Sequence, residues 1–377
     1  MPLSVGFDAK RIFENATGLG SYGRTVVRNL RRTMPEVTVQ LFAPRRSSDD
    51  LAADLANDPA VTTVFPSMAW QRPLWRQWLM CDAIAHSKVD IFHGLSNELP
   101  IGIERVGCRS IVTIHDLIFR FFPNQYSLID RRIYDFKSRR ACKSANHVIA
   151  ASESARRDIV ECYSINPSKI SVVYQGCDAS FYKRVPDSEI EALRLRYQLP
   201  REYLFTLGTM IERKNLFGLV RAWSQLPKSC AIPLVVVGRQ TRYSDAVRAW
   251  LRQNGLESSV HFLSGVPNAD LPTLYQGARA FAFPSHYEGF GIPVLEALAS
   301  GVPVVTSSVS SLPEAAGGGA ALVDPNSQEE IAAALEKVIA DETVREQLAI
   351  DGRRHLERFT PERLIADLIQ VYQDVMK

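Results

Sequence analysis

Cysteine is scarce and scattered in this chain of 377 residues, which holds six cysteines and no Cys-x-x-Cys pair. Disulfide frameworks and structural zinc sites need cysteines that are closely spaced or paired. The sequence therefore indicates reduced thiols, as in the cytoplasm, and argues against a disulfide-stapled scaffold or a zinc site.

Long apolar runs are also missing, because no uninterrupted apolar run approaches the length of a membrane span. The first residues, Met1 to Asp8, lack the basic region and the apolar core of a signal peptide. We interpret them as a first strand, and we expect a cytoplasmic protein.

A strong charge of one sign is absent as well, since the net charge is only +3. The charge is uneven, with 25 Lys and Arg against 20 Asp and Glu in residues 1–190, and 19 against 21 in the remainder. We expect no nucleic-acid partner. The slightly basic first half permits contact with an anionic membrane or a phosphate-bearing partner.

What is present is typical of a soluble globular protein, with 46% apolar and 23% charged residues. The length predicts two domains. Short apolar segments alternate with helical segments along the whole chain, which predicts an α/β fold with parallel, doubly wound sheets.

One stretch, Phe281 to Glu296, organises the chemistry of the chain. It begins as an apolar segment typical of a buried strand and continues into a loop that contains Glu288 and two glycines. Pro293 then opens a helix, where its fixed φ is tolerated. A helix start offers free N–H groups to an anion. Carboxylates accept hydrogen bonds from hydroxyls, so two of them beside such a phosphate cradle suggest a nucleotide-sugar pocket.

Glu288 and Glu296, with seven residues between them, resemble the E-x7-E motif of the retaining glycosyltransferases called group 1, or family 4. The flanking segments 284–285, 299–305 and 312–319 strengthen this resemblance. It implies the GT-B fold, in which two Rossmann-like domains with parallel sheets face each other across a cleft. The chain looks most like the mannosyltransferases of bacterial surface polysaccharide assembly.

The resemblance also implies which residues bind the sugar donor. Glu288 would orient hydroxyls of the transferred sugar, Glu296 would hold the ribose, and the loop at Gly265 and Val266 would receive the base. The donor-binding set expected in full is Gly18, Gly20, Gly208, Arg213, Lys214, Gly265, Val266, Glu288, Gly289, Phe290, Gly291, Ile292 and Glu296.

Two adjacent cations, Arg213 and Lys214, lie between a predicted strand at 203–207 and a predicted helix at 216–223. Their charge suits a leaving diphosphate, and they resemble the basic pair of the family. One branch of the family has Arg directly after the first glycine, where this chain has Thr209. We expect Arg213 to supply that charge.

In the first half, Gly18, Gly20 and Gly23 form a Gly-x-Gly-x-x-Gly pattern before a helix predicted over 21–34. The loop after the first strand is too long for a dinucleotide site, and no acidic residue is clearly placed at the next strand end. The resemblance implies that this glycine loop faces the donor diphosphate and the acceptor.

His115 follows a strand predicted at 110–114, and residues at the carboxyl ends of parallel strands point towards ligands. The resemblance matches it to the family histidine near the transferred sugar; a satisfied core histidine is the alternative. His93 and Asp116 are expected on the acceptor side. The catalytic residues expected are His115, Arg213, Lys214 and Glu288.

Two further segments of the first half have a distinctive composition: one is rich in tryptophan and the other in basic residues. Residues 67–87 carry Trp70, Trp75 and Trp78, and we favour an amphipathic helix that packs Trp75, Trp78 and Leu79 into the core over a membrane or acceptor face. Residues 130–144 hold six Arg or Lys, which we interpret as a solvated helix face, with membrane contact as the alternative.

The resemblance divides the chain into an acceptor-binding domain, residues 1–185, and a donor-binding domain, residues 200–359. A linker is expected near residues 179–202, where the pattern lapses. The last helix, residues 360–377, should pack back on the first domain.

The reaction implied is the retaining transfer of a hexose, with mannose from GDP-mannose favoured, to a hydroxyl of a glycan or lipid-linked saccharide. The nucleotide-sugar is a co-substrate, and no cofactor is expected. No Asp-x-Asp occurs, so no diphosphate-bound metal is expected either. We expect a peripheral contact with the cytoplasmic face of the inner membrane. A nucleotide-sugar epimerase or hydrolase on this fold, and a non-catalytic nucleotide-sugar-binding module, are the alternatives.

Overall fold

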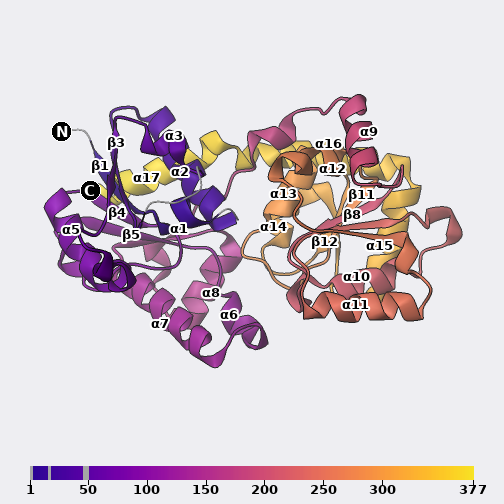
Figure 1. The fold of residues 1–377 in the computed structure, drawn as a ribbon, viewed down its shortest axis with the longest axis horizontal. Coiled ribbons are helices and arrows are strands. Elements are labelled where there is room, and N and C mark those ends of the chain that lie inside the picture. Colours follow the sequence, from indigo (N-terminus) through magenta and orange to yellow (C-terminus); the bar gives the residue numbers. More distant parts are fainter. Residues whose placement is uncertain (1–2, 16–17, 46–50) are drawn as a thin grey trace. The chain divides into compact units, whose positions relative to one another are not determined.

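A computed structural model describes residues 3–15, 18–45 and 51–377 of the chain (Figure 1). The chain forms two compact units. Unit 1 combines Met1–Gln175 with Pro361–Lys377, and unit 2 is Gly176–Thr360. Each unit is built on a fully parallel sheet, as the alternation of strands and helices predicts.

Unit 1 has a seven-stranded sheet in the order β3-β2-β1-β4-β5-β6-β7. The order reverses next to β1, which is the doubly wound arrangement of a Rossmann-like unit. The strands are β1 (Ser4–Asp8), β2 (Thr38–Phe42), β3 (Val61–Val64), β4 (Ile91–Gly94), β5 (Arg109–Ile114), β6 (His147–Ala150) and β7 (Ile170–Val172).

Helices cover both faces of this sheet, because successive side chains of a strand point to opposite faces. Ile91 and Ile111 join the cluster that includes apolar residues of α2 and α17, whereas Phe92 and Val112 join the cluster beneath α5 and α8. The helices are α1 (Lys10–Glu14), α2 (Gly18–Thr33), α3 (Ala53–Ala56), α4 (Arg72–Leu74), α5 (Met80–Ser87), α6 (Ile118–Phe121), α7 (Leu128–Ser144), α8 (Glu153–Tyr163) and α17 (Pro361–Met376).

Unit 2 has a six-stranded sheet in the order β10-β9-β8-β11-β12-β13. Its strands are β8 (Leu204–Leu207), β9 (Leu234–Val237), β10 (Val260–Leu263), β11 (Ala280–Phe283), β12 (Val304–Ser307) and β13 (Ala320–Val323). Its helices are α9 (Asp187–Arg196), α10 (Leu216–Trp223), α11 (Arg242–Gln253), α12 (Leu271–Gln276), α13 (Ile292–Ala299), α14 (Leu312–Ala316), α15 (Gln328–Ala340) and α16 (Glu342–Leu356).

The last helix, α17, belongs to unit 1 although it follows unit 2 in the sequence (Figure 1). Pro361 is its first residue, a position at which the missing N–H of proline has no consequence. The helix packs against α2 and buries Leu364, Leu368 and Tyr372 in the core of unit 1. The chain therefore crosses between the units twice, after Gln175 and after Thr360.

The prediction of a linker near residues 179–202 is wrong. In the structure α9 lies within this segment and packs against α12, and the backbone N–H of Val185 donates to the side chain of Gln276 at 2.8 Å. These contacts make the segment part of unit 2, so the predicted end of the first domain at residue 185 lies ten residues beyond the crossing at Gln175.

The tryptophan-rich segment is not one continuous helix. A 3-10 turn at Ala69–Gln71, the short α4, a π-helical stretch at Trp75–Leu79 and α5 follow one another. Trp75 is buried, with 3% of its surface exposed, but Trp78 is 58% exposed. The expectation that Trp78 packs into the core is therefore wrong, because the local change of helical period turns it outwards.

Candidate functional site

The predicted donor residues of unit 2 gather where its strands end. All strands run in the same direction, so their carboxyl ends meet at one edge of the sheet, where ligands bind in open α/β folds. Gly208 follows β8, Gly265 follows β10 and the loop with Glu288 follows β11. Since β8 lies between β9 and β11, its loop and the Glu288 loop are neighbours.

The loops after β8 and β9 pass so close that side chains have no room. Gly208 has φ +140° and Gly238 has φ +152°, and a Cβ on Gly238 would lie 1.9 Å from the carbonyl oxygen of Gly208. A Cβ on Gly208 would lie 3.4 Å from the Lys214 side chain. Gly238 is therefore required by the close passage of the Gly208 carbonyl, and Gly208 by its positive φ, since a Cβ there would make only an ordinary contact with Lys214.

Arg213 and Lys214 converge on one oxygen of Glu288. The Nη1 of Arg213 lies 2.9 Å and the Nζ of Lys214 lies 2.7 Å from Glu288 Oε1. The Lys214 ammonium also lies 4.5 Å from the centre of the Phe283 ring, a favourable cation–π distance. Two cations therefore converge on one carboxylate oxygen, and the charge of Lys214 also acts on Glu296. Such a concentration of positive side chains suits an anionic ligand.

The carboxylate of Glu288 stays ionised in this cluster. Burial alone would raise the pKa of Glu288, but the charges of Lys214 and Arg213 outweigh burial and hold it below the ordinary 4.5. Arg213 is anchored further, since its Nη1 donates to the backbone carbonyl of Tyr287 and its own carbonyl accepts from the N–H of His286 at 2.9 Å. The cluster is thus pre-organised and charged.

Residues that the sequence analysis did not single out hold this loop in place. Asn215 adopts the left-handed conformation at φ 55°, and its amide donates to the carbonyls of Pro284 and Pro325. The Ser311 hydroxyl donates to the carbonyls of Glu288 and Phe290, both at 2.8 Å. An Asn directly after the basic pair, before a helix, was the available signal for Asn215; no sequence pattern distinguished Ser311.

Glu296 lies on α13 and faces a different partner. The hydroxyl of Tyr275 donates to Glu296 Oε2 at 3.0 Å and to the carbonyl of Pro293 at 3.1 Å. Burial raises the pKa of Glu296 to about 7, although the hydrogen bond from Tyr275 and the charge of Lys214 lower it. Glu296 therefore titrates near neutrality, whereas Glu288 does not.

Helix α13 begins directly after the Glu288 loop, where the sequence predicts an anion cradle. Gly291 is the N-cap at φ +119°, and Leu312 and Ala315 lie within 3.3 Å of where a Cβ would stand. The helix begins at Ile292, one residue before Pro293. Gly289 lies beside it in the loop, and the ring of Phe290 is buried against Phe359, with centres 5.5 Å apart. Phe290 thus supports the cradle through packing.

The loop at Gly265 and Val266 lies at the edge of the unit 2 sheet. Gly265 has φ +69° and is exposed, and Val266 is partly exposed, directly after the edge strand β10. Strand β9 separates β10 from β8, so this loop is the third along the same sheet edge.

In unit 1, the structure buries His115 and uses both nitrogens of its ring. Nε2 lies 2.8 Å from the carbonyl of Leu95, so Nε2 carries the proton and donates. Nδ1 then accepts from the amide of Gln175 at 3.0 Å. Burial lowers the pKa of His115 to about 4. The ring is neutral at physiological pH and is held by its own unit.

His93 is fully buried and lies in a chain of hydrogen bonds. Its Nδ1 is 2.8 Å from the Tyr372 hydroxyl of α17, and its Nε2 is 2.8 Å from Thr113 Oγ1, which is 3.3 Å from the Tyr22 hydroxyl. Burial, and then the neighbouring His115, lower the pKa of His93 to about 3. This environment argues against direct contact between His93 and an acceptor.

Asp116 shapes the chain after β5. Its carboxylate accepts from the N–H of Ile118 at 3.1 Å, and its carbonyl accepts from the Asn97 side chain at 3.0 Å. Asn97 also accepts from the N–H of His115 at 2.9 Å. Asp116 thus helps to set the turn that begins α6.

The sequence predicts Gly18 and Gly20 in a loop, but in the structure they lie in the first turn of α2. A Cβ on Gly20 would lie 1.8 Å from the carbonyl oxygen of Asn15 and 2.7 Å from that of Arg11. Gly20 is therefore required by the close passage of the preceding segment. Gly18 is exposed, and no atom lies within 4 Å of a Cβ placed there.

A buried ion network at the carboxyl edge of unit 1 was not predicted. Arg76 Nε lies 2.6 Å from Asp8 Oδ2 at the end of β1, and Arg76 Nη1 lies 3.1 Å from Glu98 Oε2. Lys137 lies 3.1 Å from the same oxygen of Glu98. Two acids and two bases balance here.

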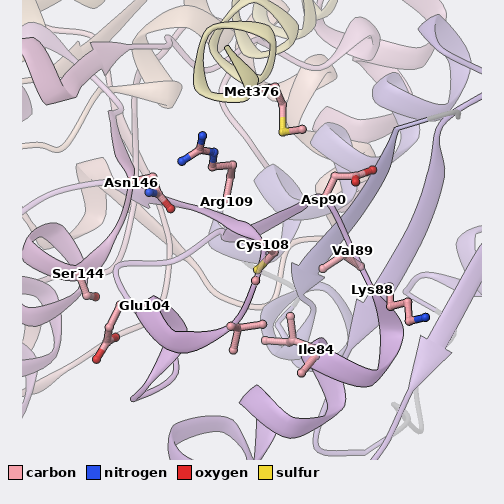
Figure 2. A pocket seen from close by; sticks show the side chains of 13 residues that line it. Ile84, Lys88, Val89, Asp90, Glu104, Cys108, Arg109, Ser144, Asn146 and Met376 are labelled. Atoms are coloured by element: carbon pink, nitrogen blue, oxygen red, sulfur yellow. The ribbon is translucent and has the colours of Figure 1, made fainter.

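Unit 1 also has a cavity of about 720 Å³, but at the opposite edge of its sheet (Figure 2). Asp90, Arg109 and Asn146, which line it, stand at the amino ends of β4, β5 and β6. Met376 of α17 lines it as well. None of the predicted site residues borders this cavity, and the amino edge is not where ligands bind in such sheets.

No cluster of three or more His, Cys, Asp or Glu side chains that could hold a metal ion occurs within residues 3–15, 18–45 and 51–377. The described part of the chain also has no helix that is long and apolar enough to cross a membrane.

Comparison with known proteins identifies the family. The model "Glycosyltransferase Family 4" matches residues 16–181, and "Glycosyl transferases group 1" matches residues 189–355. O-antigen chain mannosyltransferase B of Escherichia coli is 30% identical over an alignment of 392 positions, which covers 98% of this chain and 100% of the relative.

Solved structures agree on the fold. A glycosyltransferase of Rickettsia africae superposes with a TM-score of 0.77 at 15% identity, over 100% of this chain and 99% of that chain. Anabaena HepE in complex with UDP-glucose superposes with a TM-score of 0.76 at 19% identity, over 99% of this chain and 100% of that chain. The chain therefore has the GT-B fold and belongs to the glycosyltransferases of group 1, family 4.

Proposed function

We propose that this glycosyltransferase transfers mannose from a nucleotide diphosphate donor, GDP-mannose, to a hydroxyl of a glycan or lipid-linked saccharide, with retention of the anomeric configuration. The E. coli relative is an O-antigen chain mannosyltransferase that matches along its entire length. Its name supports mannose as the sugar and surface polysaccharide as the product. Guanine is the base proposed, following the resemblance of the sequence to mannosyltransferases.

The observation that carries this proposal is the cluster of Glu288, Arg213 and Lys214. Its two cations exceed its one carboxylate, and it lies next to the glycine cradle at the start of α13. A diphosphate leaving group needs fixed positive charge at the oxygen that departs. Glu288 adds an ionised acceptor that can bind sugar hydroxyls beside those cations.

We propose a front-face displacement for the chemical step. The acceptor oxygen forms a bond to the anomeric carbon, the bond from that carbon to the β-phosphate oxygen breaks, and the released oxygen takes the acceptor proton. Retaining glycosidases instead place two carboxylates around the scissile bond. Glu288 and Glu296 both come from one loop and helix of unit 2, and Tyr275 holds Glu296, so the two are not arranged as such a pair.

Glu296 is proposed to hold the ribose hydroxyls of the donor. A carboxylate with a pKa of about 7 binds hydroxyls best once it is ionised, because only the anion accepts in all its lone-pair directions. His115 is proposed to approach the transferred sugar. Since Leu95 and Gln175 occupy its nitrogens, contact through Nδ1 requires Gln175 to release it.

We also propose that transfer needs no metal and takes place at the cytoplasmic face of the inner membrane. The negative charge of the leaving diphosphate is then stabilised by Arg213, Lys214 and the start of α13, without a metal ion. The support for this is that the sequence has no Asp-x-Asp motif to bind a metal ion on the diphosphate.

A panel of GDP, UDP, ADP and dTDP, each with and without Mg²⁺, tests the donor pocket by thermal shift. GDP alone should raise the melting temperature, and it should do so without Mg²⁺. A shift by UDP only, or only with Mg²⁺, would contradict the base or the metal independence. No shift with any nucleotide would contradict the pocket.

Product analysis with GDP-mannose then separates transfer from its alternatives. Mannose joined to an added saccharide acceptor, with the anomeric configuration unchanged by NMR, is the expected result. Free mannose without acceptor would indicate a hydrolase, a changed sugar nucleotide an epimerase, and binding without any product a non-catalytic module.

A further inference from the structure

Helix α7 exposes an apolar face that no described part of unit 1 covers. Leu128, Ile129, Ile133 and Phe136 are all exposed, Ile129 by 72% and Phe136 by 59%. Single exposed apolar side chains are ordinary, but a contiguous group marks an interaction surface. The helix is anchored from its other side, where it buries only Ser138, Ala141 and Cys142.

The charges on this face all have the same sign. At 100° per residue, eight positions of α7 fall within an arc of about 140°, and they are either apolar or basic. We define them as the α7 face: Leu128, Ile129, Arg132, Ile133, Phe136, Arg139, Arg140 and Lys143.

The acidic residues of α7 lie outside this arc, although Asp135 borders it and pairs with Arg139 of the face at 3.8 Å. Asp135 accepts from Arg120 at 3.0 Å and from the Tyr163 hydroxyl at 3.2 Å. Asp130 stands at the capped start of the helix, where its N–H donates to Ser127 Oγ at 3.0 Å. Arg139 and Arg140 are paired with Asp135 and Glu104, but Arg132 and Lys143 are exposed and keep the face positive. This is the pattern of a helix that lies on an anionic surface.

A second group of exposed apolar residues lies beside α7. Trp70, Leu74 and Trp78 recur every four residues, and Trp70 is 65% exposed. The two segments meet at Glu98, which accepts from Gln77 at 2.8 Å and from Lys137 at 3.1 Å. Tryptophan is enriched at the level of lipid headgroups, because its ring is both large and polar at one end.

We propose that the α7 face, flanked by Trp70 and Trp78, docks unit 1 on the surface of an anionic lipid bilayer. The contact is peripheral, since no helix in the described ranges can cross a membrane. Ile129, Ile133 and Phe136 enter the boundary between headgroups and acyl chains, while Arg132 and Lys143 pair with anionic headgroups. This inference names the surface and the lipid class for the membrane contact proposed above.

Flotation of the full chain with lipid vesicles tests the proposal without any sugar donor. The protein should float with vesicles of phosphatidylcholine and phosphatidylglycerol, remain in solution with phosphatidylcholine alone, and detach at high salt. Ile129→Asn with Phe136→Ser, and separately Arg132→Glu with Lys143→Glu, should each lower vesicle partition by about tenfold or more.

Matched controls come from equally exposed residues of unit 2. Leu195→Ser with Ile350→Asn, and Arg201→Glu with Lys228→Glu, remove the same kinds of side chain and should leave vesicle binding unchanged. The thermal shift by nucleotide should persist in the α7 variants, which would show that they fold.

Three results would overturn the proposal. Equal binding to uncharged and anionic vesicles would contradict the lipid class. Unchanged flotation of both α7 variants would contradict the surface. A dimer in solution that the α7 variants dissociate, with no vesicle binding, would assign the face to a second copy of the chain. Vesicle binding without sugar transfer would contradict the proposed function alone.

Discussion

The two units place charged residues at the same edge of the same kind of sheet, yet they balance the charges differently. In unit 1, Arg76 and Lys137 are paired with Asp8 and Glu98. In unit 2, Arg213 and Lys214 converge on one oxygen of Glu288. Cations paired with buried acids hold a fold together, whereas two cations that share one carboxylate oxygen can also attract an anionic ligand.

The titratable residues near these edges differ in the same way. His93 and His115 of unit 1 are buried and neutral, with all four ring nitrogens engaged by neighbours. Glu288 of unit 2 is ionised and Glu296 titrates near neutral pH. Perturbed carboxylates beside unbalanced cations are more typical of a functional site than satisfied histidines are.

The largest effects should come from removing one cation from each unit, which separates the structural role of the unit 1 network from the ligand-binding role of the unit 2 cluster. Lys214→Ala removes the excess charge of unit 2, so turnover should fall by about 10² to 10³ while the melting temperature changes little. Arg76→Ala leaves Asp8 buried without its partner, so unfolding should become easier by about 3 to 5 kcal/mol.

Steady-state kinetics and urea denaturation of both variants check this contrast, and Lys214→Arg serves as a charge-preserving control. A Lys214→Ala enzyme with near-normal turnover would remove Lys214 from the site. If Arg76→Ala unfolds no more easily than the wild type, the network in unit 1 is not structural.

The pH dependence of nucleotide binding should isolate Glu296. Its pKa of about 7 means that the carboxylate ionises between pH 6 and 8, so affinity for the nucleoside diphosphate should rise by about tenfold over that range. Glu296→Gln should bind weakly and without this pH dependence. Calorimetric titrations at several pH values provide the measurement, and an identical pH profile in both proteins would refute the ribose contact.

The buried histidines of unit 1 and Glu296 of unit 2 should respond to acid with opposite sign. The pKa values of His93 and His115, about 3 and about 4, lie below the ordinary 6.5, so the unfolded state binds more protons and unit 1 loses stability as pH falls below 6.5. From pH 8 to pH 5 the loss is about 2 kcal/mol for each histidine.

Glu296 acts in the other direction, because its folded pKa is raised. The folded state binds more protons between pH 7 and pH 4.5, so this group stabilises unit 2 by about 2 to 3 kcal/mol as pH falls from 8 to 5. Hydrogen exchange followed by mass spectrometry, corrected for intrinsic rates, can report each unit separately. A Glu296→Gln variant whose unit 2 keeps the wild-type response to acid would contradict the assignment of Glu296.

The central strands and the donor motif could be predicted from the sequence because their signals are local. β11, the Glu288 loop and α13 follow one another within twenty residues, and each has its own pattern. Two edge strands, β3 and β13, lack such a signal. Edge strands are short and partly exposed here, so they lack the apolar runs that mark buried parallel strands.

Long-range contacts account for what else was missed. Tyr372 reaches His93 across 279 positions of sequence, and Asn215 reaches Pro325 across 110. A single sequence does not pair such residues. For the same reason the sequence could not distinguish a histidine whose nitrogens are hydrogen-bonded within the core from one that binds a ligand. Nor could it show that Trp78 is exposed.

The smallest effect we expect concerns Gln175, the last residue of unit 1 before the chain crosses into unit 2. Its amide donates to His115 Nδ1. Gln175→Ala should change turnover only a few-fold, because the bond from Nε2 to Leu95 still fixes the tautomer. Gln175→Glu replaces the donor by a carboxylate, which favours the charged imidazole and should raise the pKa of His115.

Histidine ¹⁵N NMR distinguishes these outcomes from a merely structural role. In Gln175→Ala the His115 resonances should keep the pattern of a proton on Nε2, and in Gln175→Glu they should titrate at a higher pH than in the wild type. If neither substitution alters the His115 signals, Gln175 does not hold the ring. If Gln175→Glu shifts the pKa of His115 but leaves turnover intact, His115 is a core residue like His93, and the chemistry of this enzyme rests on unit 2.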